Sequence, residues 1–200
     1  MSNKMNILHY TLGFIPYRSG GLTKYARDLM LAEKDLGHNV YAIYPGGYSL
    51  FHKSCYVHKD KSHNGIVTFK MTNPLPVSLM YGIKDVNSEI KSYDLSIKSF
   101  QKMLDELKPE VFHIHTLMGL PLEYMQEVHN RDIRIVYTSH DYFGLCPKVN
   151  FVNQNGEVCL RSSEESCAAC NVNAKSALFL RIRNAMWLMP IRAVARKIKR

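Results

Sequence analysis

Along the first 140 residues, short apolar runs alternate with longer segments in which apolar side chains recur every three or four positions. Short apolar runs bounded by turn residues predict buried strands, and the wider spacing predicts helices. The predicted strands are Asn6–Tyr10, Asn39–Tyr44, Gly65–Lys70, Val111–His115 and Ile133–Thr138. The predicted helices are Leu22–Leu36, Ser88–Lys108 and Pro121–Asn130.

The repeated order of strand, loop and helix predicts a fold of the α/β class. A right-handed crossover from the first predicted strand to the second makes these two strands parallel. We therefore expect a Rossmann-like, open and mostly parallel sheet with flanking helices. Residues 48–64 show only weak periodicity, and we predict an irregular segment there.

The pattern changes after residue 140, so we divide the chain into three parts. Residues 1–140 form the predicted Rossmann-like domain. Residues 141–173 are polar and rich in cysteine, and we interpret them as an insertion within the same domain. Residues 174–200 form a basic, amphipathic helical tail that Pro190 interrupts.

The charge is distributed unevenly along the chain. Residues 171–200 contain eight Lys or Arg residues and no Asp or Glu, so they carry eight of the nine net positive charges. The nearly neutral body argues against a nucleic-acid partner, and the tail indicates an anionic surface near the C-terminus. No run approaches the roughly 20 apolar residues that a membrane-spanning helix needs, and no secretion signal is visible. We therefore expect a cytoplasmic location.

The loop after the first predicted strand is the first candidate site, because ligands of open parallel sheets bind at the carboxyl ends of the strands. Gly20 and Gly21 directly precede the first predicted helix, and Arg18 and Lys24 flank them. Glycine lets a ligand approach the backbone closely, and a helix N-terminus attracts anions. This pattern predicts a phosphate or diphosphate site, and the alternative is a tight turn before a helix.

Histidines at two later strand ends are the next candidates. His113 and His115 share one face of the fourth predicted strand; an H-x-H pair can bind metal only with further ligands. We interpret His113 as a hydrogen-bonded residue at the edge of the core. For His115, a position at the core edge and a position in a ligand-binding cleft are equally compatible with the pattern. His140 and Asp141 end the fifth predicted strand, where they suit acid/base chemistry or the binding of sugar hydroxyls. The alternative is that Asp141 caps a loop.

Four of the five cysteines fall within 25 residues, in the order Cys146-x12-Cys159-x7-Cys167-x2-Cys170. A C-x-x-C pair is the usual half of a zinc site, and two more thiolates complete a tetrahedral set. A structural zinc ion is one reading of this pattern. Reduced thiols, or a redox or disulfide role, are the others.

The tail offers a candidate membrane surface. Beyond Pro190, apolar and basic residues occupy different faces of a predicted helix, as in helices that lie on anionic lipid. The apolar residues are Ile191, Val194, Ala195 and Ile198, and the basic residues are Arg192, Arg196 and Lys199. A helix that packs against protein is the alternative.

Several of these segments together resemble the N-terminal domain of family-4 glycosyltransferases of the bacterial surface-polysaccharide type, which have the GT-B fold. The resemblance covers roughly residues 5–200. It is carried by Ile7–Tyr10, Pro16–Gly21, Pro109–Thr116, Ile135–Tyr142 and Cys146-Pro147.

The resemblance implies a function and a set of roles. Family members have two Rossmann-like domains that face a cleft, and they transfer a sugar from a nucleotide-sugar to a glycan or lipid-linked acceptor, with retention of configuration and without a catalytic metal. By resemblance, Gly20 and Gly21 approach the donor diphosphate and His140 lies beside the reacting sugar.

The resemblance also implies that this chain is the acceptor-side half of such an enzyme. A C-terminal donor domain would then be supplied in trans, and the isolated chain would be inactive. Many members act at the inner membrane, which agrees with a peripheral location through residues 174–200. The alternative is a truncated, non-catalytic module that docks on the membrane or on a partner glycosyltransferase.

Overall fold

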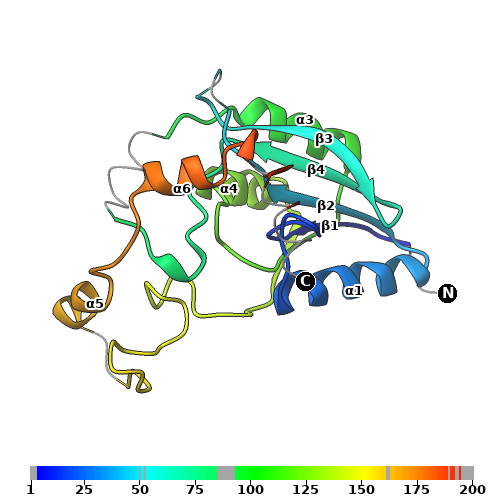
Figure 1. Ribbon diagram of the computed structural model, residues 1–200. Helices are drawn as coiled ribbons and strands as arrows, with labels where there is room; N and C mark the ends of the chain where they lie inside the picture. The colour runs from blue at the N-terminus through cyan, green and yellow to red at the C-terminus, as the bar shows by residue number, and fades with distance from the viewer. Residues whose placement is uncertain are drawn as a thin grey trace.

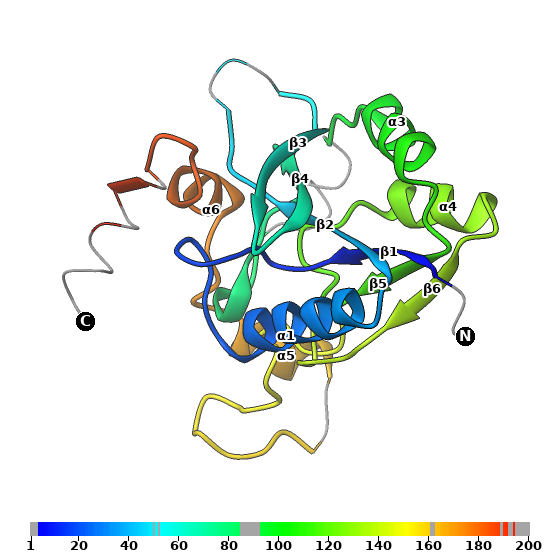
Figure 2. The ribbon, with the colours of Figure 1, turned by 90° about the vertical axis from the view of Figure 1, so that its right-hand side faces the viewer.

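A computed structural model describes residues 4–49, 51, 53–84, 93–160, 163–188, 190–191 and 194. Its sheet has the strand order β3-β4-β2-β1-β5-β6 (Figures 1 and 2). The strands are β1 (Asn6–Tyr10), β2 (Asn39–Pro45), β3 (Tyr56–His63), β4 (Ile66–Thr72), β5 (Val111–Ile114) and β6 (Arg134–Tyr137). β3 runs antiparallel to β4, and the other neighbouring pairs are parallel. The predicted open, mostly parallel α/β sheet is confirmed.

Helices cover both faces of this sheet (Figure 2). The helices are α1 (Gly21–Asp35), α3 (Ile97–Leu107), α4 (Leu122–Asn130), α5 (Glu164–Cys170) and α6 (Ala177–Arg183), and a 3-10 turn spans Leu79–Tyr81. On the α3 and α4 side, Phe100 stacks on Tyr124 with ring centroids 3.9 Å apart. On the α1 side, Ala26 and Met30 pack against Ala42 of β2. Because strand side chains alternate, each strand contributes to both cores.

The predicted irregular segment at residues 48–64 is wrong in its second half, because β3 occupies Tyr56–His63. This strand lies at the sheet edge and carries mostly polar residues, so it lacks the apolar alternation of a half-buried strand. A two-residue turn joins it to β4, with positive φ angles of 52° at Asn64 and 73° at Gly65. Asn-Gly is the favoured sequence for such a hairpin turn, and this signal was missed.

The second predicted helix begins later than expected, at Ile97. The residues just before it are extended, since the backbone of Cys55 hydrogen-bonds to Asp94 and to Ser96 on either side of Leu95. The predicted start near Ser88 lies in residues 85–92, outside the described part of the chain. Pro121, predicted as the first helical residue, instead precedes α4 with an extended ψ of 141°.

Beyond residue 140, the chain leaves the sheet and forms loops, α5 and α6 (Figure 1). The predicted helical character of the tail is confirmed for Ala177–Arg183. Most of the predicted amphipathic segment after Pro190, including Arg192, Arg196 and Lys199, lies outside the described residues. Within the ranges that the structure covers, no helix has both the length and the hydrophobicity to cross a membrane.

Candidate functional site

Three buried histidines lie beneath α1, on or just after the neighbouring strands β1 and β5. His9 of β1 stands directly opposite His113 of β5 in the parallel register. Their strand neighbours Leu8 and Phe112 belong to the core on the α3 side, so alternation directs the histidines toward α1. His115 follows β5 on the same face and is 1% exposed, so it lies in the interior.

Two of these histidines, His9 and His115, form a hydrogen-bonded chain with Glu33 of α1 and with His140, which follows β6. Nε2 of His9 lies 2.6 Å from a carboxylate oxygen of Glu33. Nδ1 of His9 lies 3.0 Å from Nε2 of His115, and Nδ1 of His115 lies 3.4 Å from Nε2 of His140. The chain therefore connects a carboxylate on α1 to His140.

The carboxylate determines the direction of every hydrogen bond in this chain when the rings are neutral. Ionised Glu33 can only accept, so Nε2 of His9 donates and Nδ1 of His9 accepts. The same reasoning makes Nε2 of His115 and then Nε2 of His140 donors. Nδ1 of His140 is thereby left as a hydrogen-bond acceptor.

Burial keeps His115 uncharged. Desolvation, with smaller contributions from His113, His9 and His140, lowers the pKa of His115 to about 2. Desolvation also lowers the pKa of His140, although Asp141 beside it acts in the opposite direction. His140 is consequently a neutral imidazole at pH 7, able to accept a proton.

The same histidines are spaced closely enough to hold a metal ion. His9, His113 and His115 each offer a ligand atom, and these atoms lie within 4.8 Å of one another. Among the described residues, they are the one group with such spacing. Each ring already has a hydrogen-bond partner, since His113 Nε2 lies 2.8 Å from the hydroxyl of Thr138 and the other two rings take part in the chain. A metal ion would compete with these hydrogen bonds.

His140 and Asp141, the two residues predicted as site residues at the end of β6, have different surroundings. The ring of Tyr25 on α1 lies 4.8 Å from the ring of His140, edge to face. The carboxylate of Asp141 accepts a hydrogen bond from the backbone of Phe143 at 3.0 Å, which caps the following turn. His140 thus joins the histidine chain, whereas Asp141 has a local structural contact.

The glycine loop leads into α1 as expected, and open space lies in front of both glycines. A Cβ atom built on Gly20 or Gly21 would meet no atom within 4 Å. Gly20 has a φ of 131°, a conformation that other residues rarely adopt, whereas Gly21 has no such constraint. No acidic residue lies in the first turn of α1, so nothing there opposes an anion.

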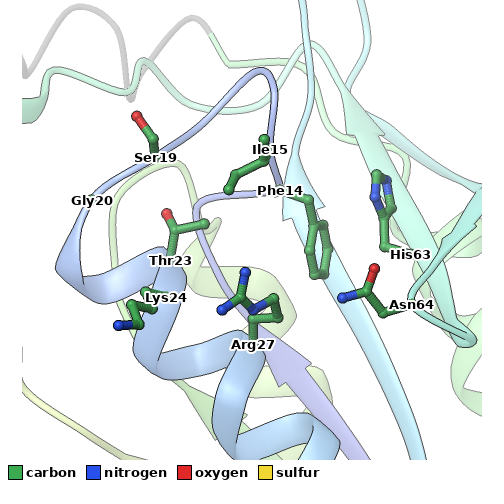
Figure 3. Close-up of a pocket in the computed structure, with 9 residues that line it drawn as sticks. All are labelled: Phe14, Ile15, Ser19, Gly20, Thr23, Lys24, Arg27, His63 and Asn64. Atoms are coloured by element: carbon green, nitrogen blue, oxygen red, sulfur yellow. The ribbon is translucent and has the colours of Figure 1, made fainter. Parts of the chain in front are cut away.

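A cavity of about 370 Å³ lies between the start of α1 and the β3–β4 hairpin (Figure 3). Gly20 and Lys24 line it, and so do residues that the sequence did not single out. These are Phe14, Ile15, Ser19, Thr23, Arg27, His63 and Asn64. The hairpin residues were missed because nothing in the local sequence brings residues 63 and 64 next to α1.

Not all of the residues that were predicted to bind an anion line this cavity. Arg18 points elsewhere and donates a hydrogen bond to the side-chain oxygen of Asn184 at 3.2 Å. Arg27, which does line the cavity, is paired with Asp28. No residue of the histidine chain lines this cavity, so it and His140 are separate features near α1.

The four clustered cysteines lie far from α1 in sequence; none of them forms a disulfide, and each is partly exposed. They line one small cavity next to α5. Cys55 forms no disulfide either, and it is buried in the sheet core.

The chain is similar to a bacterial protein and to one solved structure over part of their lengths. No protein-family profile matches the chain. A protein of Klebsiella pneumoniae, described as an uncharacterized 42.6 kDa protein in cps region, is 24% identical over 174 residues, covering 79% of this chain and 42% of that protein. The catalytic domain of starch synthase IV from Arabidopsis thaliana, bound to ADP and acarbose, aligns with a TM-score of 0.44 and 16% identity over 70% of this chain and 34% of that domain. The chain thus spans less than half the length of each protein.

Proposed function

We propose that this chain is the acceptor-side domain of a retaining glycosyltransferase that uses a nucleotide-sugar donor in the synthesis of a surface polysaccharide. The observation that carries the proposal is the position of two features beside the first turns of α1, at the carboxyl edge of a parallel sheet. These features are the open glycine loop and His140. Ligands bind at this edge in folds of this kind.

The two features are close enough to serve one substrate pair. Tyr25, which contacts His140, follows Gly21 by four residues, or about 6 Å along the helix axis. The free amides at the start of α1 suit a donor diphosphate, because they carry partial positive charge. Lys24, one turn further, adds a full positive charge.

His140 suits the acceptor sugar. The chain from Glu33 presents Nδ1 of His140 as an acceptor, and the neutral ring can receive a hydrogen bond from a sugar hydroxyl. Glu33 and His9 are positioning residues in this proposal, since they act on His140 through His115. We propose no catalytic metal, and we assign the rest of the donor site to a second domain.

The relative in Klebsiella pneumoniae agrees with this proposal, because its description places it in a cps region. The segments that resemble family-4 glycosyltransferases support it as well. Three of them, at Pro16–Gly21, Pro109–Thr116 and Ile135–Tyr142, contain the loop and the two histidine-bearing strand ends that meet near α1.

The proposal is tested by measuring the amount of surface polysaccharide that is made by the organism carrying the gene. A His140→Ala allele is compared with the wild-type allele and with His129→Ala, which alters an exposed histidine on α4. We expect His140→Ala to reduce the polysaccharide at least tenfold, with normal protein levels, and His129→Ala to leave it unchanged. Wild-type polysaccharide in the His140→Ala strain would refute the assigned role.

A second function, docking on a membrane, is favoured by one surface. Exposed apolar side chains gather on and just after α6, where the basic residues Arg181 and Arg183 also lie. These apolar residues are Leu178, Phe179, Ile182, Met186 and Trp187. Such a surface suits the interface of an anionic bilayer.

Sedimentation with vesicles containing anionic lipid tests this second function. We expect Phe179→Glu combined with Ile182→Glu to reduce binding severalfold, because both side chains would enter the bilayer interface. Leu122→Glu, an equally apolar and exposed position on α4, is the control. Equal binding by all three proteins would exclude this surface.

A further inference from the structure

The four clustered cysteines converge although they come from three different local structures. Cys146 belongs to a loop, Cys159 to a short hairpin, and Cys167 and Cys170 to α5. All four line a single cavity of about 200 Å³. Cys167 and Cys170 are three residues apart in a helix, so their side chains lie on one face.

The hairpin brings Cys159 to the Cys146 loop through backbone hydrogen bonds. Val152 and Val158 form an antiparallel bridge. The amide of Cys159 donates to the carbonyl of Phe151 at 2.7 Å, and the amide of Asn153 donates to the carbonyl of Glu157 at 2.9 Å. This pairing, rather than side-chain packing, places Cys159 beside the loop.

The loop after Cys146 turns back on itself, since the amide of Val149 donates to the carbonyl of Cys146 at 2.9 Å. Val149 and Phe151 have positive φ angles of 59° and 51°, which a β-branched or bulky residue rarely adopts. The loop thus maintains an unfavourable backbone conformation beside the partly exposed thiol of Cys146.

This part of the chain has little apolar core of its own. No residue of α5 is buried, and Val158 and Leu160 are 71% and 89% exposed. The helix depends locally on a capping box, in which Ser163 and Ser166 satisfy each other's backbone amides. A segment of this kind needs another source of order, and a bound metal can supply it.

We propose that Cys146, Cys159, Cys167 and Cys170 bind one Zn²⁺ ion in a closed, structural site. Each thiol loses its proton when its sulfur bonds to the metal, and four thiolates complete the tetrahedral coordination that zinc prefers. Among the described residues, the group already spaced for a metal ion is His9, His113 and His115 rather than the cysteines, so zinc binding would draw α5 and the hairpin toward the Cys146 loop. The site lies apart from the histidine chain and orders residues 146–170.

The first measurement is the zinc content of the full chain, purified under reducing conditions. We expect one zinc per chain, and its release when a mercurial reagent modifies the thiols. The Cys167→Ser, Cys170→Ser double variant should lose the metal, whereas Cys55→Ala should retain it because Cys55 lies in the sheet core. Replacement of zinc by Co²⁺ should give the intense near-ultraviolet absorption of thiolate-to-cobalt charge transfer.

The competing site is the cluster of His9, His113 and His115. Cobalt there would lack the thiolate absorption, and His9→Gln would abolish binding while the cysteine variant retained it; this result would overturn the proposal. Metal-free protein in which the four clustered thiols are reactive, or form disulfides with one another, would overturn it too. The cobalt spectrum of the wild-type chain decides the matter even if a cysteine variant fails to fold. None of these readouts depends on sugar transfer, so failure of the zinc site and failure of the proposed function are distinguishable.

Discussion

At the scale of single residues, the histidine chain is the feature with the most consequences. Buried polar groups are stable only when they are hydrogen-bonded and uncharged or paired. His9 and His115 are almost completely buried, and their shared hydrogen bond satisfies both rings. Adding a proton to this interior costs free energy, so the folded state should be sensitive to acid.

We therefore predict that stability falls as the pH drops below 6.5. The pKa of His115 is about 2 in the folded protein and ordinary in the unfolded chain, so between these values the unfolded state binds more protons. Each pH unit lowers the free energy of unfolding by up to about 1.4 kcal/mol, so the loss between pH 6.5 and pH 5 is about 2 kcal/mol. Burial lowers the pKa of His113 and His140 in the same direction.

Urea unfolding between pH 7.5 and 5, with a chelator present so that metal release does not contribute, measures this dependence. The exposed His129→Ala variant should show the same slope as the wild-type chain. A free energy of unfolding that stays constant over this range would show that the histidine interior does not resist protonation.

The two adjacent glycines of the loop should respond differently to substitution. Gly20→Ala forces a side chain into a φ of 131° and should cost about 1–2 kcal/mol of stability. Gly21→Ala meets no protein atom and should leave the thermal midpoint unchanged. If a donor diphosphate contacts this loop, Gly21→Ala should nevertheless reduce sugar transfer about tenfold, since its methyl group occupies the space of the ligand. Full activity in Gly21→Ala would place the diphosphate elsewhere.

At the scale of elements, the ends of helices were the hardest features to predict from local patterns. α3 illustrates this at both of its ends. Its apolar stripe extends beyond the helix because Leu95 continues the buried surface in an extended conformation. At its other end Lys108, rather than glycine, adopts the left-handed conformation with a φ of 45°.

Lys108→Gly should therefore stabilise the protein, by about 0.5–1 kcal/mol, because glycine adopts this conformation without strain. The backbone hydrogen bond from residue 108 to Leu104 would be kept. Lys102→Gly, at an exposed position inside the same helix, should instead cost about 1 kcal/mol. Chemical denaturation measures both values, and a destabilised Lys108→Gly protein would contradict the argument.

At the scale of the whole molecule, the sheet has one well-protected edge and one exposed edge within the described residues. The edge strand β3 carries charged residues such as Lys59 and Lys61, which discourage pairing with another chain. At the other edge, every residue of β6 is exposed, and Ile135, Val136 and Tyr137 are apolar. An apolar edge of this kind is prone to pair with a further strand.

We predict that the 200-residue chain self-associates through β6 at high concentration. Val136→Lys should shift the weight-average mass in sedimentation velocity toward the monomer, because a charge on the edge opposes strand pairing. Leu36→Lys, which changes an exposed leucine at the end of α1, should have no such effect. Equal self-association in the two variants and the wild-type chain would rule out the β6 edge.

Local signals in the sequence were sufficient to predict most of the strands and the start of α1. Apolar runs identified β1, β2, β4, β5 and β6, and the glycine loop identified the start of α1, because burial and backbone conformation leave direct traces in residue order. Which side chains meet depends on the tertiary structure. It brings Glu33, His9, His115 and His140 into one chain, although 131 positions separate the first and last of these histidines and neither His9 nor Glu33 was predicted as a site residue. It also brings Arg18 to Asn184, and Asp141 to the backbone of Phe143. Such contacts depend on strand register and on the position of α1 over the sheet, and neither is encoded in any short segment.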